Sequence, residues 1–252
     1  MKKTYWLLLA STVLAGQTLA ADIQPTMEAK ASGVQVGQQY LQQTISQAIT
    51  EFEQTSRKDW SYRISRYENE EGDITSSIEQ FDPLKDQPKQ WSLLQINGQT
   101  PTEKQAKKFV KSKRKNADDS DQQSFSVKLR DIIQLDSLQL VSEDHESIKA
   151  SFDVYLSQLG EEATESLQGS LIFMKDRQFI ETIEISNKGE FSPLFSAEIT
   201  DFKLTFRFLK IDTAILPQQN DLAMKGTFAF FTEIDEVSTD TYSDYQYVGQ
   251  VD

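Results

Sequence analysis

The sequence predicts an α+β fold that is mostly antiparallel β: a curled, open-barrel sheet with an N-terminal helix and a second helix as its lid. Beyond residue 125, apolar and polar residues alternate through most of the chain, which is the period of a strand with one wet face. The strands follow one another without room for crossover helices, so they must pair antiparallel. Two segments with helical spacing then supply a partial lid for the apolar face.

Residues 1–20 have the layout of an export signal. Lys2 and Lys3 precede an apolar run over residues 5–15, and residues 18–20 offer small side chains for cleavage. We therefore expect a soluble periplasmic protein whose mature chain begins at Ala21 or Asp22. The chain contains no cysteine, so we expect neither a lipid anchor at this start nor any disulfide. No second hydrophobic stretch reaches the roughly 18 residues of a membrane span, which predicts no integral membrane insertion.

After a flexible leader over 21–33, residues 34–248 are predicted to form one β-rich domain. Its first element is a helix over 34–58, because apolar residues recur there at steps of three, four and seven. A hairpin over 60–65 and 74–78 follows, and a short strand over 91–96 stops at the turn dipeptide Asn97-Gly98.

The second helix is predicted over 101–115. Thr100 can cap it, Pro101 suits the first helical position, and Glu103 completes a capping box. The polar run over 116–123 is predicted to be a mobile loop. Further strands are predicted over 147–156, 169–174, 178–186, 202–208 and 222–234, with one more near the C-terminus.

The charge of the chain is strongly negative and unevenly spread. The formal net charge is −13, and residues 116–252 hold 10 Lys/Arg against 26 Asp/Glu. Such acidity disfavours nucleic acid as a partner.

The second predicted helix is basic, in contrast to the rest of the chain. Five lysines share one face at helical spacing: Lys104, Lys107, Lys108, Lys111 and Lys115. This face can dock on anionic phospholipid or an acidic partner, or it can be a solvated face that balances the acidic sheet.

A second candidate site comes from apolar residues that alternate along two of the predicted strands. It comprises Phe202, Leu204, Phe206, Phe208, Met224, Phe228 and Phe230. These residues either line an acyl-chain cavity, since ligand sites are concave and mostly apolar, or fill a solid core.

No catalytic or metal-binding motif stands out. His145 is the only histidine, and without cysteine it lacks the further ligands that a transition metal needs, so we interpret it as part of a charged turn. Gly-x-Ser-x-Gly and phosphate-binding glycine loops are missing. The acidic groups at Glu161, Glu162 and Glu165, and at Asp118, Asp119 and Asp121, fall in predicted loops. We expect no cofactor and no enzymatic activity, with an uncharacterised hydrolase as the alternative.

The order of these elements resembles the periplasmic lipoprotein-carrier superfamily. A local pattern is similar to one in uncharacterised exported bacterial proteins: Asp82-Pro83, Trp91-Ser92-Leu93-Leu94, Asn97-Gly98 and Pro101-Thr102. The resemblance implies an incomplete barrel with a helical plug, and a concave cavity that binds acyl chains in several members.

The expected function is binding of a lipid or other apolar ligand in the concave face of the sheet. The alternative is a structural or adaptor protein with a filled core, which contacts an envelope partner or an anionic membrane surface through residues 104–115.

Overall fold

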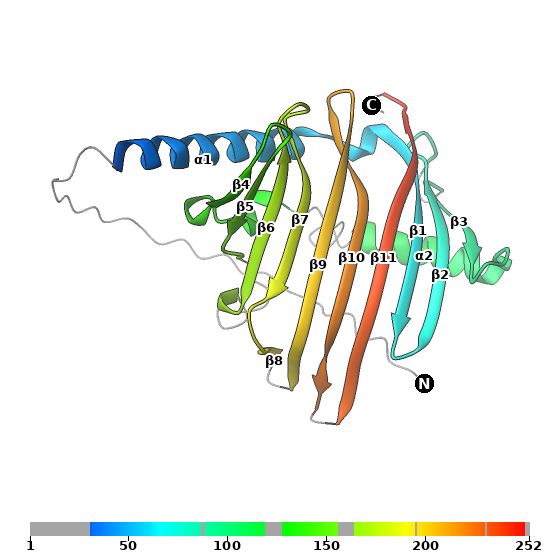
Figure 1. Cartoon of the computed structure of the whole chain (residues 1–252). Helices are drawn as coiled ribbons and strands as arrows, with labels where there is room; N and C mark the ends of the chain where they lie inside the picture. Colours follow the sequence, from blue (N-terminus) through cyan, green and yellow to red (C-terminus); the bar gives the residue numbers. More distant parts are fainter. Residues whose placement is uncertain are drawn as a thin grey trace.

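A computed structural model describes residues 31–86, 89–118, 128–155, 164–194, 196–229 and 231–249. The predicted export signal lies outside the described residues. The predicted fold class is confirmed: the chain forms an open, curled antiparallel sheet of 11 strands with few helices (Figure 1). The strands are β1 Trp60–Glu70, β2 Asp73–Phe81, β3 Trp91–Ile96, β4 Gln139–Glu143, β5 Ser147–Phe152, β6 Leu167–Met174, β7 Phe179–Asn187, β8 Phe191–Leu194, β9 Ala197–Ile211, β10 Ala214–Phe228 and β11 Thr232–Tyr247.

The sheet joins two blocks of consecutive strands. Its order is β3-β2-β1-β11-β10-β9-β7-β6-β5-β4, with β8 paired to β9 beside this path. The link is the antiparallel pairing of β1 with β11, from Trp60 opposite Tyr247 to Glu70 opposite Glu236. The first and last of the described strands therefore lie side by side inside the sheet, a long-range pairing that strand periodicity does not predict.

Helix α1, Ala31–Gln54, packs one apolar stripe on the sheet. Leu41, Ile45 and Ile49 are buried in it, at most 3% exposed. The helix contacts β7, β10, the short helix α3 (Leu129–Ile132) and the 3-10 turn η2 (Leu135–Ser137). It ends four residues before the predicted residue 58, because the chain turns through a second 3-10 helix, η1 Arg57–Asp59, into β1.

Helix α2, Glu103–Asp118, begins two residues later than predicted. The capping box is formed by Thr102 and Gln105, not by Thr100 and Glu103. The Gln105 backbone N–H donates to Thr102 Oγ1 at 3.4 Å, and the Thr102 N–H donates to Gln105 Oε1 at 2.8 Å. Residues 116–118 of the predicted mobile loop belong to α2, and residues 119–123 lie outside the described residues.

The predicted strand over 222–234 is two strands, β10 and β11. The chain reverses between Phe228 and Thr232, where Ala229 has a φ of 51°. Apolar residues continue at even positions through this turn, so the alternation alone hides the break.

Two buried clusters hold the molecule together. The larger, here called the apolar core, joins α1 and α3 to β5, β6, β7, β9 and β10 through residues such as Ile45, Ile148, Leu171 and Ile183. The smaller, here called the aromatic core, contains Trp60, Tyr62, Ile64 and Leu216, with Phe81, Trp91, Tyr242 and Tyr245 packed against it. Among the described helices, none has both the length and the hydropathy of a membrane span.

Candidate functional site

One row of directly opposite residues runs across the face of the sheet that carries the helices, here called the concave face. Opposite residues of paired strands share a face, so the row shows how side-chain chemistry changes along it. From β3 to β4 it reads Ile96, Ser77, Arg66, Asp240, Asn220, Phe206, Ile183, Leu171, Ala150 and Leu140. The row passes from charged residues on β1 and β11, through an amide on β10, to apolar residues on β9 to β5.

The charged end of this row is an ion-pair network that we call the charged cluster. At its centre is Glu79, a carboxylate on β2 that is only 5% exposed. It accepts hydrogen bonds from Arg66 Nε at 3.0 Å and from Lys113 Nζ of α2 at 2.7 Å. Arg66 also pairs through Nη1 with Asp240 on β11. The charged cluster therefore ties three neighbouring strands to α2.

Burial and mutual attraction compete within the charged cluster. Burial lowers the pKa of Arg66, but the carboxylates of Glu79 and Asp240 outweigh it and hold that pKa above its usual value. Burial raises the pKa of Asp240 despite the attraction of Arg66. Burial also lowers the pKa of Lys113, although Glu79 opposes it. Each carboxylate thus faces a cation, which suits a structural anchor for α2.

Aromatic rings complete this anchor. The Lys113 ammonium lies 4.3 Å from the centre of the Trp91 ring and 5.1 Å from that of Phe109. Cations are attracted to the face of an aromatic ring at such distances. Lys113 therefore helps to hold the lid helix on the sheet.

A cleft of about 460 Å³ lies where the charged and apolar parts of the concave face meet. Apolar side chains from α1, β9 and β10 form its walls: Phe52, Phe206, Phe208, Ile215 and Pro217. The rings of Phe52 and Phe208 are 4.8 Å apart in an edge-to-face contact. The volume falls within the range of small-molecule sites, roughly 300–1,000 Å³.

The polar lining of the cleft is rich in cations for so acidic a chain. It consists of Arg57, Lys128, Arg130, Glu53, Asp131, Thr55 and Asn220. Arg130 already has partners within the protein, because its Nη2 donates to Thr50 Oγ1 at 2.9 Å and its Nε lies 3.5 Å from Glu53. Arg57 and Lys128 are the other cations of this lining.

Asn220 connects the cleft to the aromatic core. Its Nδ2 lies 3.5 Å from the Tyr242 hydroxyl. Burial raises the pKa of Tyr242, and it raises that of Tyr62 to about 12, so both phenols stay neutral at physiological pH. Beside the charged groups of the lining, Asn220 therefore meets a neutral hydroxyl of the aromatic core.

The structure places most of the predicted cavity residues on the concave face. Phe206 and Phe208 line the cleft, while Phe202, Leu204 and Met224 are half-buried against the apolar core. Phe228 is half-buried at the end of β10, and Phe230 lies outside the described residues.

Sequence reasoning missed Phe52, Asn220 and Arg57 as part of the same site. Both Phe52 and Arg57 fall within the helix predicted over 34–58, whose spacing indicates only a buried stripe. A signal for Asn220 was available, because it precedes Leu222 and Met224 at the same strand spacing. The strand period likewise places Glu79 on the same face as Phe81, two residues away, and so indicates an inward carboxylate.

The basic face of α2 is exposed at Lys104, Lys107, Lys108 and Lys111, and Lys107 pairs with Glu103. The side chain of Lys115 lies outside the described ones. His145 is exposed in the turn between β4 and β5, with Nε2 3.2 Å from Glu146 Oε1.

The structure describes two of the acidic residues that were predicted to lie in loops. Glu165 is exposed, and Asp118 is the last residue of α2. Residues 119, 121, 161 and 162 lie outside the described residues. Among the residues that the structure describes, no three His, Asp or Glu side chains gather in a way that could hold a metal ion.

No family model matches the chain, and no curated protein does. Among solved structures, the chain is similar to a DUF1329 family protein from Desulfovibrio piger, with a TM-score of 0.36 and 9% identity. The match covers 85% of this chain and 94% of the other. At this TM-score the likeness supports no inference about function.

Proposed function

We propose that the protein is a non-enzymatic periplasmic binder of an anionic amphiphile, whose acyl chain lies in the cleft under the end of α1. The observation that carries the proposal is the position of the cleft. It lies where the concave face changes from apolar to polar, with Phe206 beside Asn220 in the same row. An amphiphile has the same change of polarity along its length.

The apolar walls would hold the chain of the ligand. Phe52, Phe206 and Phe208 contribute aromatic rings to the lining, together with Ile215 and Pro217. Burial of apolar surface contributes on the order of 25 cal/mol per Å².

The cationic lining would hold the head of the ligand. Arg57 and Lys128 favour a carboxylate or phosphate, and Asn220 can donate a hydrogen bond from its amide. A carboxylate and a phosphate head share this chemistry, so both classes of amphiphile belong in the test.

Displacement of the fluorescent fatty acid cis-parinaric acid by dodecanoate or dodecyl phosphate tests the proposal. Asn220→Trp should block the cleft and weaken binding at least ten-fold. The matched control is Ala223→Trp, which adds the same ring to an exposed position of the same strand on the opposite face. Equal binding by the two variants would contradict the assignment of the cleft.

A second comparison tests the head group. Lys128→Glu should weaken binding of dodecanoate several-fold and leave dodecanol unaffected, because only the carboxylate interacts with the charge. An equal loss of affinity for both ligands would show that Lys128 maintains the shape of the cleft and does not bind the head group.

Export has its own test. The layout of residues 1–20 supports a periplasmic location, and fractionation of cells that express the full chain should recover a shortened protein in the periplasm. Organic extraction of that protein, followed by mass spectrometry, should release an acyl compound.

One observation favours the alternative of an adaptor with a filled core. Phe206 and Phe208 are only 3% and 4% exposed, so much of their surface is already covered by protein. A filled core predicts no saturable displacement of cis-parinaric acid and no acyl compound in the extract.

A further inference from the structure

The lid helix α2 presents two different faces. Phe109 and Lys113 point to the sheet, where Lys113 reaches Glu79. The helix crosses the concave side of the sheet near β3, β2 and β1 (Figure 1). Because successive residues of a helix are 100° apart, Lys104, Lys108 and Lys111 lie on the side opposite Phe109 and Lys113.

The outer lysines have no ion-pair partner among the described residues. Lys104, Lys108 and Lys111 are exposed, whereas the neighbouring Lys107 pairs with Glu103. Three exposed ammonium groups therefore project from one helix of a chain whose net charge is −13.

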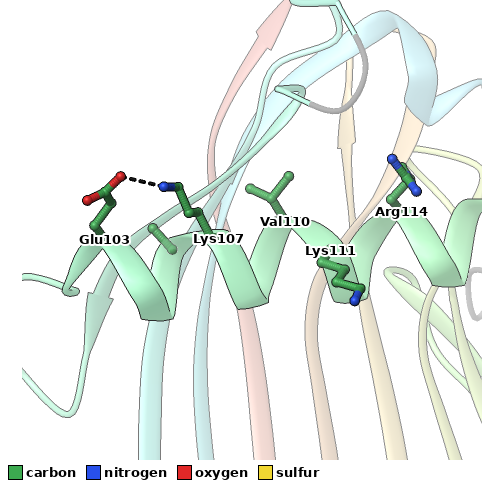
Figure 2. Close-up of a pocket in the computed structure, with 6 residues that line it drawn as sticks. Glu103, Lys107, Val110, Lys111 and Arg114 are labelled. Carbon is green, nitrogen blue, oxygen red and sulfur yellow. Dashed lines mark ion pairs between the residues drawn. The ribbon is translucent and has the colours of Figure 1, made fainter.

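A shallow groove with apolar side chains runs along the flank of the same helix. Figure 2 shows Val110 between the charged side chains of Lys107 and Arg114. Ala106 also contributes to this groove, and both apolar residues are only half-buried. A helix with lysines beside a modest apolar strip is typical of segments that lie on a membrane surface.

From these observations we propose that α2 docks the protein on an anionic phospholipid bilayer, with the concave side towards the lipid. Lysines suit this partner, because an ammonium on a flexible stem attracts a diffuse layer of phosphates without requiring the paired geometry of arginine. Each lysine near such a surface contributes enough attraction that losing three lowers binding by a factor of about 100.

The acidity of the rest of the chain fixes the orientation. A surface of negative charge repels the acidic strands and attracts the exposed lysines that gather on α2. At physiological ionic strength these forces reach only about 8 Å, so the nearest charges decide. Docking in this orientation brings the side of the molecule that carries the cleft close to a source of amphiphiles, and this last step alone rests on the proposed function.

Co-sedimentation with vesicles tests the docking. The full chain should bind phosphatidylglycerol vesicles at low salt and lose binding on phosphatidylcholine vesicles or at high salt. The triple variant Lys104→Glu, Lys108→Glu, Lys111→Glu should bind at least 100-fold more weakly. The matched control is Lys58→Glu, Lys149→Glu, Lys188→Glu, which changes the net charge equally at exposed positions away from α2.

The proposal is overturned if the full chain does not co-sediment with phosphatidylglycerol vesicles, or if the two triple variants lose binding equally. Displacement of cis-parinaric acid separates this result from the proposed function, since the cleft contains no residue of α2. A docking variant that keeps fatty-acid binding and loses vesicle binding supports both proposals. A full chain that binds vesicles but no fatty acid supports the docking and refutes the ligand site.

Discussion

The two sides of the concave face use the same backbone pairing and opposite side-chain chemistry. On one side, α1 packs on the apolar core that contains Ile183, Leu171 and Ala150, none of which is measurably exposed. On the other side, α2 is held by Lys113 to the carboxylate of Glu79, beside Arg66 and Asp240. One helix is therefore packed by apolar area and the other is tied by charge.

This difference explains where the cleft lies. An apolar core closes without specific partners, whereas buried charges must each meet an opposite charge. At the boundary, Phe206 of the apolar core lies opposite the polar Asn220, and both line the cleft. The comparison leads to three predictions on stability.

The largest effect is expected in the apolar core. Ile183→Ala should lower the free energy of unfolding by about 4 kcal/mol, because it removes buried methyl groups and leaves a cavity. Urea denaturation followed by circular dichroism measures it. Ile172→Ala, on the opposite face of β6, should cost only about 1 kcal/mol. Equal costs would show that the apolar core does not carry the stability of this side.

The next effect is expected in the charged cluster. Glu79→Gln should cost about 3 kcal/mol, because it leaves the charges of Arg66 and Lys113 facing each other with one carboxylate fewer. Its control is Glu184→Gln, which breaks the more exposed pair with Lys203 and should cost less than about 1 kcal/mol. If Glu79→Gln is as mild as its control, the anchor of α2 lies elsewhere.

The third effect is a loss of stability at alkaline pH, and it arises in the aromatic core. The pKa of Tyr62 is about 12 in the folded chain and about 10 in an unfolded chain, so the folded form keeps a proton that the unfolded form releases. This raised pKa leaves stability intact below pH 10 and reduces it as the pH rises towards 12, by on the order of 2 kcal/mol.

Tyr62→Phe should remove that part of the alkaline loss, which urea denaturation at pH 8 and at pH 11 measures. Tyr40→Phe serves as its control, since it removes a phenol from an exposed site on α1. Identical pH profiles for wild type and Tyr62→Phe would contradict the burial of this hydroxyl.

Elements with a strong local period were predictable from the sequence. Both long helices, the first hairpin and the antiparallel order beyond residue 125 follow from spacing within each segment. The pairing of β1 with β11 was not predictable, because it joins residues about as far apart as the domain allows and depends on competition among strand edges.

The candidate site could be predicted only in part, for a related reason. Alternation along β9 places Phe206 and Phe208 on one face, which is enough to make them candidate cavity residues. It does not show that the end of α1 brings Phe52 to Phe208, or that the β10 register sets Asn220 opposite Phe206. Those contacts arise from tertiary packing.

We propose that an amphiphile occupies the cleft between the two sides of the concave face. Methyl NMR of isoleucine-labelled protein during titration with dodecanoate tests it most directly. We expect a saturable shift of the Ile215 methyl, which lines the cleft, while the methyls of Ile148 on β5 and Ile172 on the opposite face of β6 stay in place. An unmoved Ile215 at saturating dodecanoate, or shifts centred on Ile172, would contradict it.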